Sequence, residues 1–135
     1  MHFCLVDAVL ERGPDRIVTL KHVSSAEEYL QDHFPGYPVL PGVMMLEAMV
    51  QAARALEDPA GEASPPLVLG SVRGLKYGRF VPPGSTLRVE VTRHKATAEG
   101  VEFKAEATVL DPQAPPGTEA PVAASGRILL RPARV

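Results

Sequence analysis

The amino-acid sequence predicts an α+β fold in which a largely antiparallel sheet of about six strands curls around one long, buried helix. One segment alone has the length and composition of a long helix, and it is apolar around most of its circumference. About six other segments have strand character, and turns rich in proline and glycine separate them. Strands and helices do not alternate along the chain, which argues against a parallel sheet.

The chain opens with a predicted β-hairpin. An apolar run from Phe3 to Leu10 reads as a strand, and Gly13-Pro14 ends it. Residues 16–23 (RIVTLKHV) have an imperfect alternation typical of a second strand. Because the two runs follow each other closely, an antiparallel hairpin is the simplest arrangement.

Helical signals come next. In residues 24–30 (SSAEEYL) a serine can cap a helix and an acid falls three residues later, which predicts one or two helical turns. A loop dense in proline follows at 32–41 (DHFPGYPVLP). Residues 42–56 (GVMMLEAMVQAARAL) are strong helix formers with no proline and no glycine after the first position. They are the one predicted long helix.

The second half of the chain reads as strands. After a linker at 57–66, the predicted strands span 67–81, 86–97, 101–110 and 122–130. The stretch 111–121 (DPQAPPGTEAP) cannot be strand, because its prolines lack the N–H that a ladder requires. We expect it to be an exposed, mobile excursion. Residues 1–135 together form one predicted domain.

Composition excludes several classes of function. A net charge of −2 and 5% aromatic residues argue against nucleic-acid binding, which usually requires a basic surface or stacking aromatic side chains. No apolar stretch approaches the roughly 18 residues of a membrane helix, and the first residues lack signal-peptide features, so we expect a cytoplasmic protein. The histidines show no metal-ligand spacing, and no dinucleotide or phosphate-loop motif is present. Cys4 lies in an apolar run and is expected to be a small core residue.

Two residues are candidates for chemistry. Glu47 is the only acid in an apolar helical segment, and an ionised carboxylate buried without a partner costs several kcal/mol. It could instead lie on one solvent-exposed stripe of the helix, together with Gln51 and Arg54 at the following i+4 and i+7 positions. His33 precedes Phe34-Pro35 and, taken alone, could simply be a loop residue that binds a carbonyl group.

The whole segment changes this balance. Residues 33–43 (HFPGYPVLPGV) and 46–51 (LEAMVQ) closely resemble the signature of the β-hydroxyacyl-(acyl carrier protein) dehydratases of the FabZ type, H-F-P-G-x-P-x-x-P-G-V followed by L-E-A-M-x-Q. The interval from histidine to glutamate, 47 − 33 = 14, is that of the family. Residues 23–31 and 76–84 are also similar to family segments, so the resemblance covers nearly the whole chain. The departures from the pattern are Asp32, Phe80, Ser85 and the length of 111–121.

The resemblance implies a hot-dog fold and a dehydratase of fatty acid synthesis. The enzyme would remove water from 3-hydroxyacyl-(acyl carrier protein) thioesters to give trans-2-enoyl thioesters, without cofactor or metal. The family pattern assigns His33 as the base, Glu47 as the acid and the Gly42 N–H as the group that stabilises the enolate. It also implies a homodimer or a trimer of dimers, in which His33 and Glu47 of one site come from different subunits.

The chemistry of elimination suits these residue types. A neutral imidazole can accept a weakly acidic proton, provided that amides at a helix N-terminus stabilise the enolate. Glu47 lies five residues beyond Gly42, about 7.5 Å along a helix axis, which suits the far end of a short substrate head. Met44, Met45 and Met49 are candidate walls of an acyl tunnel, although any one of them could be ordinary core filler.

Other readings of the same sequence remain. A hot-dog acyl thioesterase also places an acid on the central helix, but it gives no reason for the histidine loop. A non-catalytic acyl-binding subunit would have no need of both His33 and Glu47. An isomerase-type dehydratase resembles this sequence too, but that sister group carries aspartate at the position of Glu47.

Overall fold

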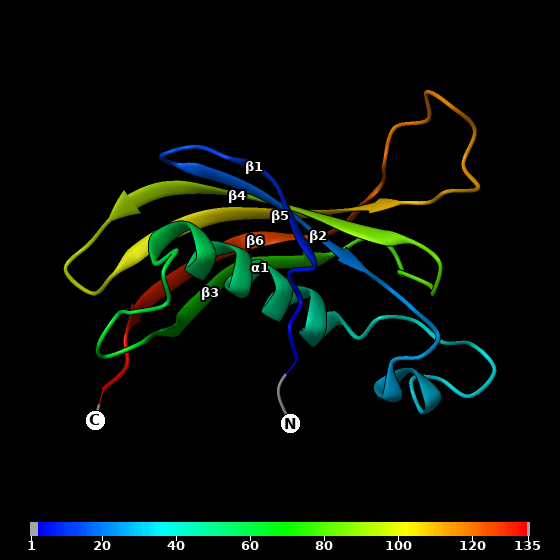
Figure 1. Cartoon of the computed structure of the whole chain (residues 1–135), viewed down its shortest axis with the longest axis horizontal. Coiled ribbons are helices and arrows are strands. Elements are labelled where there is room, and N and C mark those ends of the chain that lie inside the picture. The colour runs from blue at the N-terminus through cyan, green and yellow to red at the C-terminus, as the bar shows by residue number, and fades with distance from the viewer. Residues whose placement is uncertain (1–2, 135) are drawn as a thin grey trace.

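The computed structural model describes residues 3–134 and contains a six-stranded antiparallel sheet, a long helix and a short one. In chain order the elements are β1 (Ala8–Arg12), β2 (Arg16–His22), η1 (Glu28–Gln31), α1 (Gly42–Glu57), β3 (Leu67–Tyr77), β4 (Thr86–Ala96), β5 (Val101–Leu110) and β6 (Val122–Pro132). The strand order in the sheet is β1-β2-β4-β5-β6-β3. Figure 1 shows the sheet curving over α1, which lies against one of its faces. This is the predicted hot-dog architecture.

The core fills the space between α1 and the sheet. Along β4 and β5 buried and exposed residues alternate, so one face of each strand points to the helix. The helix contributes small and flexible side chains to this layer, which let the sheet approach closely: Met45, Ala48, Met49, Ala52 and Ala53. They meet large inward side chains of the sheet: Ile17, Leu87, Val89, Val91, Phe103 and Ile128. The helix therefore has the same core role as in the prediction.

Two details at the N-terminus differ from the prediction. Strand β1 begins at Ala8, not at Phe3, because residues 3–5 run along α1 instead of joining the sheet. The prediction for Cys4 is wrong, since the residue is exposed and its thiol donates to the carbonyl of Val6. An apolar run can pack against a helix as an extended segment just as it can form a strand, so its composition did not decide between the two.

The helix is less completely covered than its composition suggested. Met45 and Met49 are buried, but Val43 is 67% exposed, and Leu46 and Glu47 are only partly buried. A single sheet layer covers one side of α1, which leaves a stripe near its beginning accessible.

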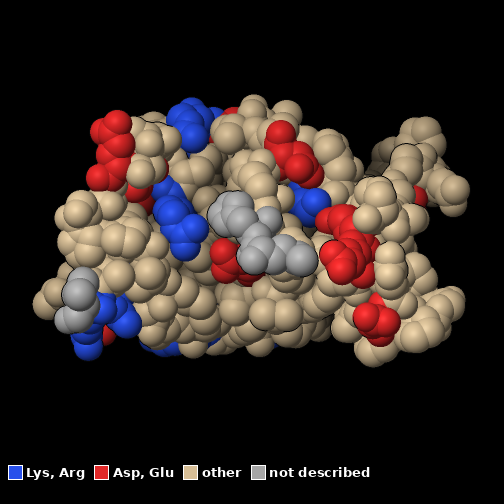
Figure 2. Space-filling view, turned by 60° about the horizontal axis from the view of Figure 1, so that its bottom comes forward, with Lys and Arg blue, Asp and Glu red and all other residues tan. Residues whose placement is uncertain are grey.

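In Figure 2 charged side chains of both signs form separate clusters, and red clusters lie at the end of the molecule that carries η1.

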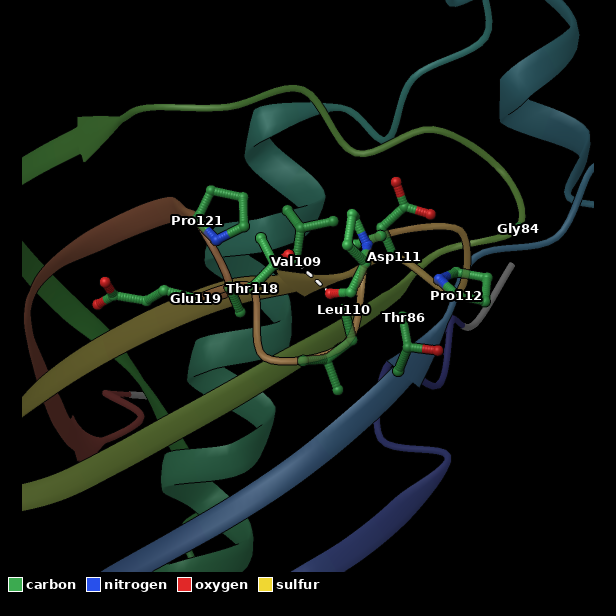
Figure 3. A pocket seen from close by; sticks show the side chains of 12 residues that line it. Gly84, Thr86, Val109, Leu110, Asp111, Pro112, Thr118, Glu119 and Pro121 are labelled. Carbon is green, nitrogen blue, oxygen red and sulfur yellow. Dashed lines mark hydrogen bonds between the residues drawn. The ribbon is translucent and has the colours of Figure 1, made fainter.

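The segment 111–121 is a protruding excursion between β5 and β6, as predicted, and contains no strand (Figure 1). It folds into two turns, closed by hydrogen bonds from the Ala114 N–H to the Asp111 carbonyl and from the Thr118 N–H to the Pro115 carbonyl. Together with Gly84 and Thr86 it lines a shallow cavity of about 410 Å³ (Figure 3). Within residues 3–134, no helix is long and apolar enough to cross a membrane.

Candidate active site

The histidine loop is a tight turn that its sequence dictates. Phe34 and Tyr37 exchange two backbone hydrogen bonds, of 2.9 and 3.0 Å, across Pro35 and Gly36. Gly36 has a φ of +75°, a conformation that side chains with a Cβ rarely adopt. Proline followed by glycine is the sequence preferred at the centre of a type II turn. The turn therefore explains why the motif contains Pro35-Gly36.

The turn fixes the side chain of His33. Its Nδ1 lies 2.8 Å from the carbonyl oxygen of Val39, while the Val39 N–H donates to the His33 carbonyl at 2.9 Å. Because a carbonyl can only accept, Nδ1 carries the proton and donates it. The ring stacks on Phe34, with centroids 4.2 Å apart. Nε2 is therefore left with a free lone pair and can act as a base.

His33 and Gly42 border the same cavity. It has a volume of about 710 Å³, and aromatic, apolar and glycine residues form most of its wall: His33, Phe34, Val39, Leu40, Gly42, Met45, Tyr77, Gly78, Arg79 and Phe80. Of the three methionines proposed as tunnel walls, Met45 lines this cavity, whereas Met49 is buried in the core. An apolar cavity with one imidazole and one helix terminus suits an acyl chain that ends in a polar head.

The start of α1 supplies the polar end of the cavity. Gly42 is the first residue of the helix, so its N–H has no acceptor within the helix and carries part of the positive end of the dipole. A Cβ at Gly42 would lie 2.8 Å from ring carbon Cζ of Tyr77. The absence of a side chain at Gly42 therefore makes room for the ring of Tyr77. It would also let a substrate approach the backbone at this position.

Glu47 does not line this cavity. Five residues after Gly42, it lies about 140° around the helix, on a different side. The side chain is partly buried, and its Oε1 accepts a hydrogen bond of 3.2 Å from Nε2 of Gln51. The structure thus brings His33 and Gly42 together within one chain, and it leaves Glu47 on the accessible stripe of α1.

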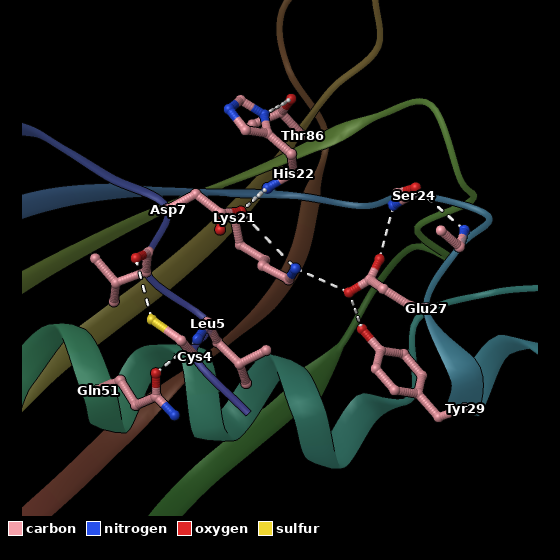
Figure 4. Close-up of polar contacts among 12 residues, drawn as sticks. Cys4, Leu5, Asp7, Lys21, His22, Ser24, Glu27, Tyr29, Gln51 and Thr86 are labelled. Carbon is pink, nitrogen blue, oxygen red and sulfur yellow. Dashed lines mark hydrogen bonds and ion pairs between the residues drawn. The ribbon is translucent and has the colours of Figure 1, made fainter. Parts of the chain in front are cut away.

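Gln51 ties Glu47 to the N-terminal segment. Its Oε1 accepts from the Leu5 N–H at 2.7 Å (Figure 4). Its Nε2 donates to the Phe3 carbonyl at 2.8 Å as well as to Glu47. Glu47, Gln51 and Arg54 are all partly exposed, as in the alternative of a polar helix stripe, and Phe3 and Leu5 bind Gln51 on that stripe. Arg54 donates to the Leu67 carbonyl at 3.1 Å.

A polar cluster holds the segment that leads into the histidine loop. Lys21, only 8% exposed, places Nζ 2.8 Å from Oε1 of Glu27, which also accepts from the Tyr29 hydroxyl (Figure 4). The second oxygen of Glu27 accepts from the Ser24 N–H at 2.7 Å. This is the carboxylate half of the predicted capping box. The cluster joins the end of β2 to η1. The short helix η1 ends at Gln31, and Asp32 and His33 follow it directly.

The aromatic residues at the cavity mouth were not identified as site residues from the sequence. Tyr77, Arg79 and Phe80 come from the end of β3 and the residues after it, and Phe80 packs edge-on against Tyr37 at 6.2 Å between centroids. Their one signal in the sequence was the family-like segment 76–84. Tyr77 and Phe80 could be identified as site residues only once the structure placed the end of β3 next to the start of α1.

Comparisons with known proteins identify the family of the chain. A family model described as ApeI-like (ApeI dehydratase) matches residues 10–112. The chain is 39% identical over 117 residues to the 3-hydroxyacyl-[acyl-carrier-protein] dehydratase FabZ of Lactococcus lactis subsp. cremoris (strain MG1363), covering 86% of this chain and 81% of the relative. It is 40% identical over 114 residues to the protein of the same name from Chloroflexus aggregans, covering 81% and 77%.

A solved structure shares the fold. The dehydratase heterocomplex ApeI:P from Xenorhabdus doucetiae superposes with a TM-score of 0.65 over 93% of this chain and 96% of that one, at 18% sequence identity. At this identity the likeness is one of architecture, and it agrees with the sheet order and central helix described above.

Proposed function

This chain belongs to the ApeI-like and FabZ-type dehydratases, and from that premise we propose that it removes water from 3-hydroxyacyl thioesters carried on an acyl carrier protein. The product would be the trans-2-enoyl thioester of fatty acid synthesis. The observation that carries the proposal is the pairing in one apolar cavity of an imidazole with a free Nε2 and the first N–H of a helix.

In the proposed first half of the reaction, Nε2 of His33 removes a proton from the carbon next to the thioester carbonyl. Electrons move onto the carbonyl oxygen, and the Gly42 N–H donates a hydrogen bond to that oxygen. A helix N-terminus is suited to this role because its amides are oriented before the reaction begins. The hydrogen bond from Nδ1 to the Val39 carbonyl stabilises the imidazolium that forms.

In the second half, a protonated carboxyl group of Glu47 donates its proton to the hydroxyl on the next carbon, and the bond from carbon to that oxygen breaks. Water leaves, and a double bond forms between the two carbons. His33 ends protonated and Glu47 ionised, so transfer of one proton from His33 to Glu47 resets the site. The reaction consumes no oxidant or reductant and requires no cofactor.

We propose that His33 and Glu47 of one site come from two subunits of a homodimer or of a trimer of dimers. Two observations support this. Glu47 does not reach the cavity of its own chain, and the stripe of α1 that carries Glu47 is accessible. A second copy placed against that stripe could bring its own cavity, with His33 and Gly42, to this Glu47.

The alternatives have less support. A thioesterase would use an acid on α1 but has no need of an imidazole whose proton is fixed on Nδ1 by the loop. A non-catalytic acyl-binding subunit needs neither His33 nor Glu47. The relatives above carry the name of dehydratases.

Incubation with 3-hydroxyacyl thioesters tests the function, with the absorbance of the conjugated enoyl product as the readout. We expect His33→Ala and Glu47→Ala each to lower turnover by about 10²- to 10⁴-fold, the usual contribution of an acid–base group. Circular dichroism should show both variants folded. The double variant should be scarcely slower than either single variant, because the two groups act in one step.

Two results would contradict the proposal. Release of free thiol without the enoyl product would indicate a thioesterase. Near wild-type turnover of either single variant would remove that residue from the mechanism.

A further inference from the structure

The outer face of the sheet carries a groove that the proposed reaction does not use. It crosses β3, β6 and β5 on the side away from α1, and its volume is about 540 Å³. Every residue that lines it is either small or cationic. The small ones are Gly74, Ala105, Ser125 and Gly126, and the cationic ones are Arg73, Lys76, Lys104 and Arg127.

The strand register places three of the cations in one row. Arg73 of β3 lies directly opposite Arg127 of β6, and Arg127 lies directly opposite Lys104 of β5. Residues that pair in this way project from the same face of a sheet, where like charges repel and destabilise the pairing. A row of three cations on neighbouring strands therefore costs stability unless a negative charge meets it.

A β-bulge adds the fourth cation. Arg73 and Lys76 are three residues apart, so regular alternation would put them on opposite faces of β3. The register shifts between them, and Lys76 pairs with Ser125, which is on the same face as Arg127. Gly74 within the bulge has a φ of +61°, a conformation that favours glycine. Bulges commonly re-aim a side chain next to a functional site, and this one directs Lys76 to the groove.

The chain supplies only part of the opposite charge. The Glu102 carboxylate accepts two hydrogen bonds from Nη2 of Arg73, at 2.8 and 2.9 Å, and lies 3.6 Å from Nη1 of Arg127. Burial raises the pKa of Glu102, but the hydrogen bonds and charge of Arg73, together with the charges of Lys95 and His94, hold that pKa below its usual value. Lys76 and Lys104 form no ion pair within residues 3–134.

We propose that this groove binds a compact anion with more than one negative charge, namely the phosphate or diphosphate group of a small molecule. Four cations line the groove, whereas two acids of the same face lie near it, Glu102 in its ion pair with Arg73 and Glu106 opposite Ser125, so the charge at the groove stays positive. The floor of small residues lets a tetrahedral oxyanion approach the backbone. Arginine and lysine together suit phosphate, since the guanidinium fork can bind two of its oxygens and the ammonium group adds a point charge.

Titration with inorganic diphosphate tests the proposal. Calorimetry is run on the full chain at one ionic strength, with sodium chloride as the compensating salt. We expect saturable binding to the wild-type protein and about tenfold weaker binding to Lys104→Ser and to Arg127→Ser, because each change removes one charge-assisted contact. Lys104→Ser is the safer variant, since Arg127 also neighbours Glu102.

A matched control separates the groove from general surface charge. Arg88 lies on β4, on the same outer face, and does not line the groove. Arg88→Ser removes the same charge and should bind diphosphate within about twofold of wild type. Absence of saturable binding to the wild-type protein, or an equal loss in Arg88→Ser, would overturn the proposal. Weaker binding of an acyl carrier protein to Lys104→Ser, with no diphosphate binding by the wild type, would also overturn it and would assign this face to a protein partner.

Discussion

The side-chain amide of Gln51 has only one orientation that satisfies its partners. The Leu5 N–H can only donate and the Phe3 carbonyl can only accept, so the oxygen of the amide must face Leu5 and its nitrogen must face Phe3. The nitrogen then has a second N–H to donate to Oε1 of Glu47. One oxygen of Glu47 is thereby held, and Oε2 is left for the proton that the proposed mechanism transfers.

We expect Gln51→Leu to lower kcat by about tenfold, the effect of losing one hydrogen bond to a charged or acidic group. KM should change little, because Gln51 does not line the cavity that contains His33. The measurement is steady-state kinetics of dehydration. Gln113→Leu in the exposed excursion is the matched control and should match wild type. An unchanged kcat in Gln51→Leu would show that Glu47 needs no such support.

At the scale of elements, the cluster of Lys21, Glu27 and Tyr29 joins β2 to η1. Burial of Glu27 raises its pKa, but the hydrogen bonds from Lys21, Tyr29 and the Ser24 N–H outweigh that effect and lower the pKa below 4.5. Burial and the bond to Glu27 raise the pKa of Tyr29, so its hydroxyl stays protonated and remains a donor. The cluster is therefore fully formed at neutral pH.

The lowered pKa of Glu27 makes part of the stability depend on pH. An acid with a folded-state pKa below its unfolded value stabilises the protein fully above the unfolded value, here about 4.5, and the contribution is lost as the pH falls through the lower folded-state value. We expect Glu27→Gln to cost about 1–2 kcal/mol of unfolding free energy at pH 7 and progressively less below pH 4.5. Urea unfolding at several pH values measures this.

Glu28→Gln is the control for that experiment. Glu28 is exposed, so its variant should follow the wild-type stability curve at every pH. A constant difference between Glu27→Gln and wild type from pH 7 to pH 3 would mean that the ionised form of Glu27 contributes nothing to the cluster.

The excursion at 111–121 is an element with little apolar surface to bury. We expect its replacement by a short turn to change the unfolding free energy by no more than about 1 kcal/mol, because the cost of closing a loop depends weakly on its length. Protease should cut the wild-type chain here first and leave dehydratase activity intact. A larger loss of stability, or loss of activity in a stable variant, would show instead that the excursion docks on a neighbouring subunit or on the carrier protein.

Periodicity and turn residues predicted most elements, because β4, β5 and α1 each bury one consistent face. The motif around His33 and Glu47 could be found because residues 33–51 resemble a family signature, in which proline and glycine occupy fixed positions. The sequence could not indicate that residues 3–5 would reach Gln51, or that Tyr77 would fill the space beside Gly42. Both contacts join segments far apart in the chain, and no local pattern encodes such a pairing.

At the scale of the whole molecule, a single chain leaves too much apolar surface exposed around the cavity. Phe34, Tyr37, Tyr77 and Phe80 are each half exposed or more. Within the described residues, β3 pairs only with β6, so the backbone groups along its other edge are open. Large apolar patches and open strand edges are typical of surfaces that meet another chain. We expect light scattering to give a mass well above the 14.4 kDa of one chain.

A mixing experiment distinguishes a shared site from one made by a single chain. The His33→Ala and Glu47→Ala proteins, each expected to be nearly inactive, are mixed under conditions in which subunits exchange. If His33 and Glu47 come from different subunits, a mixed dimer has one complete site and one that lacks both groups. Random exchange makes about half of the dimers mixed, so activity should rise to about one quarter of wild type.

The control replaces one partner by the double variant, His33→Ala with Glu47→Ala. No pairing of the double variant with either single variant contains a complete shared site, so that mixture should stay inactive while undergoing the same exchange. If both groups of a site belonged to one chain, the two single variants could not complement each other, because every subunit would lack one group. Absence of recovery despite exchange shown by mass spectrometry would therefore place the acid of the reaction elsewhere than on the partner's helix.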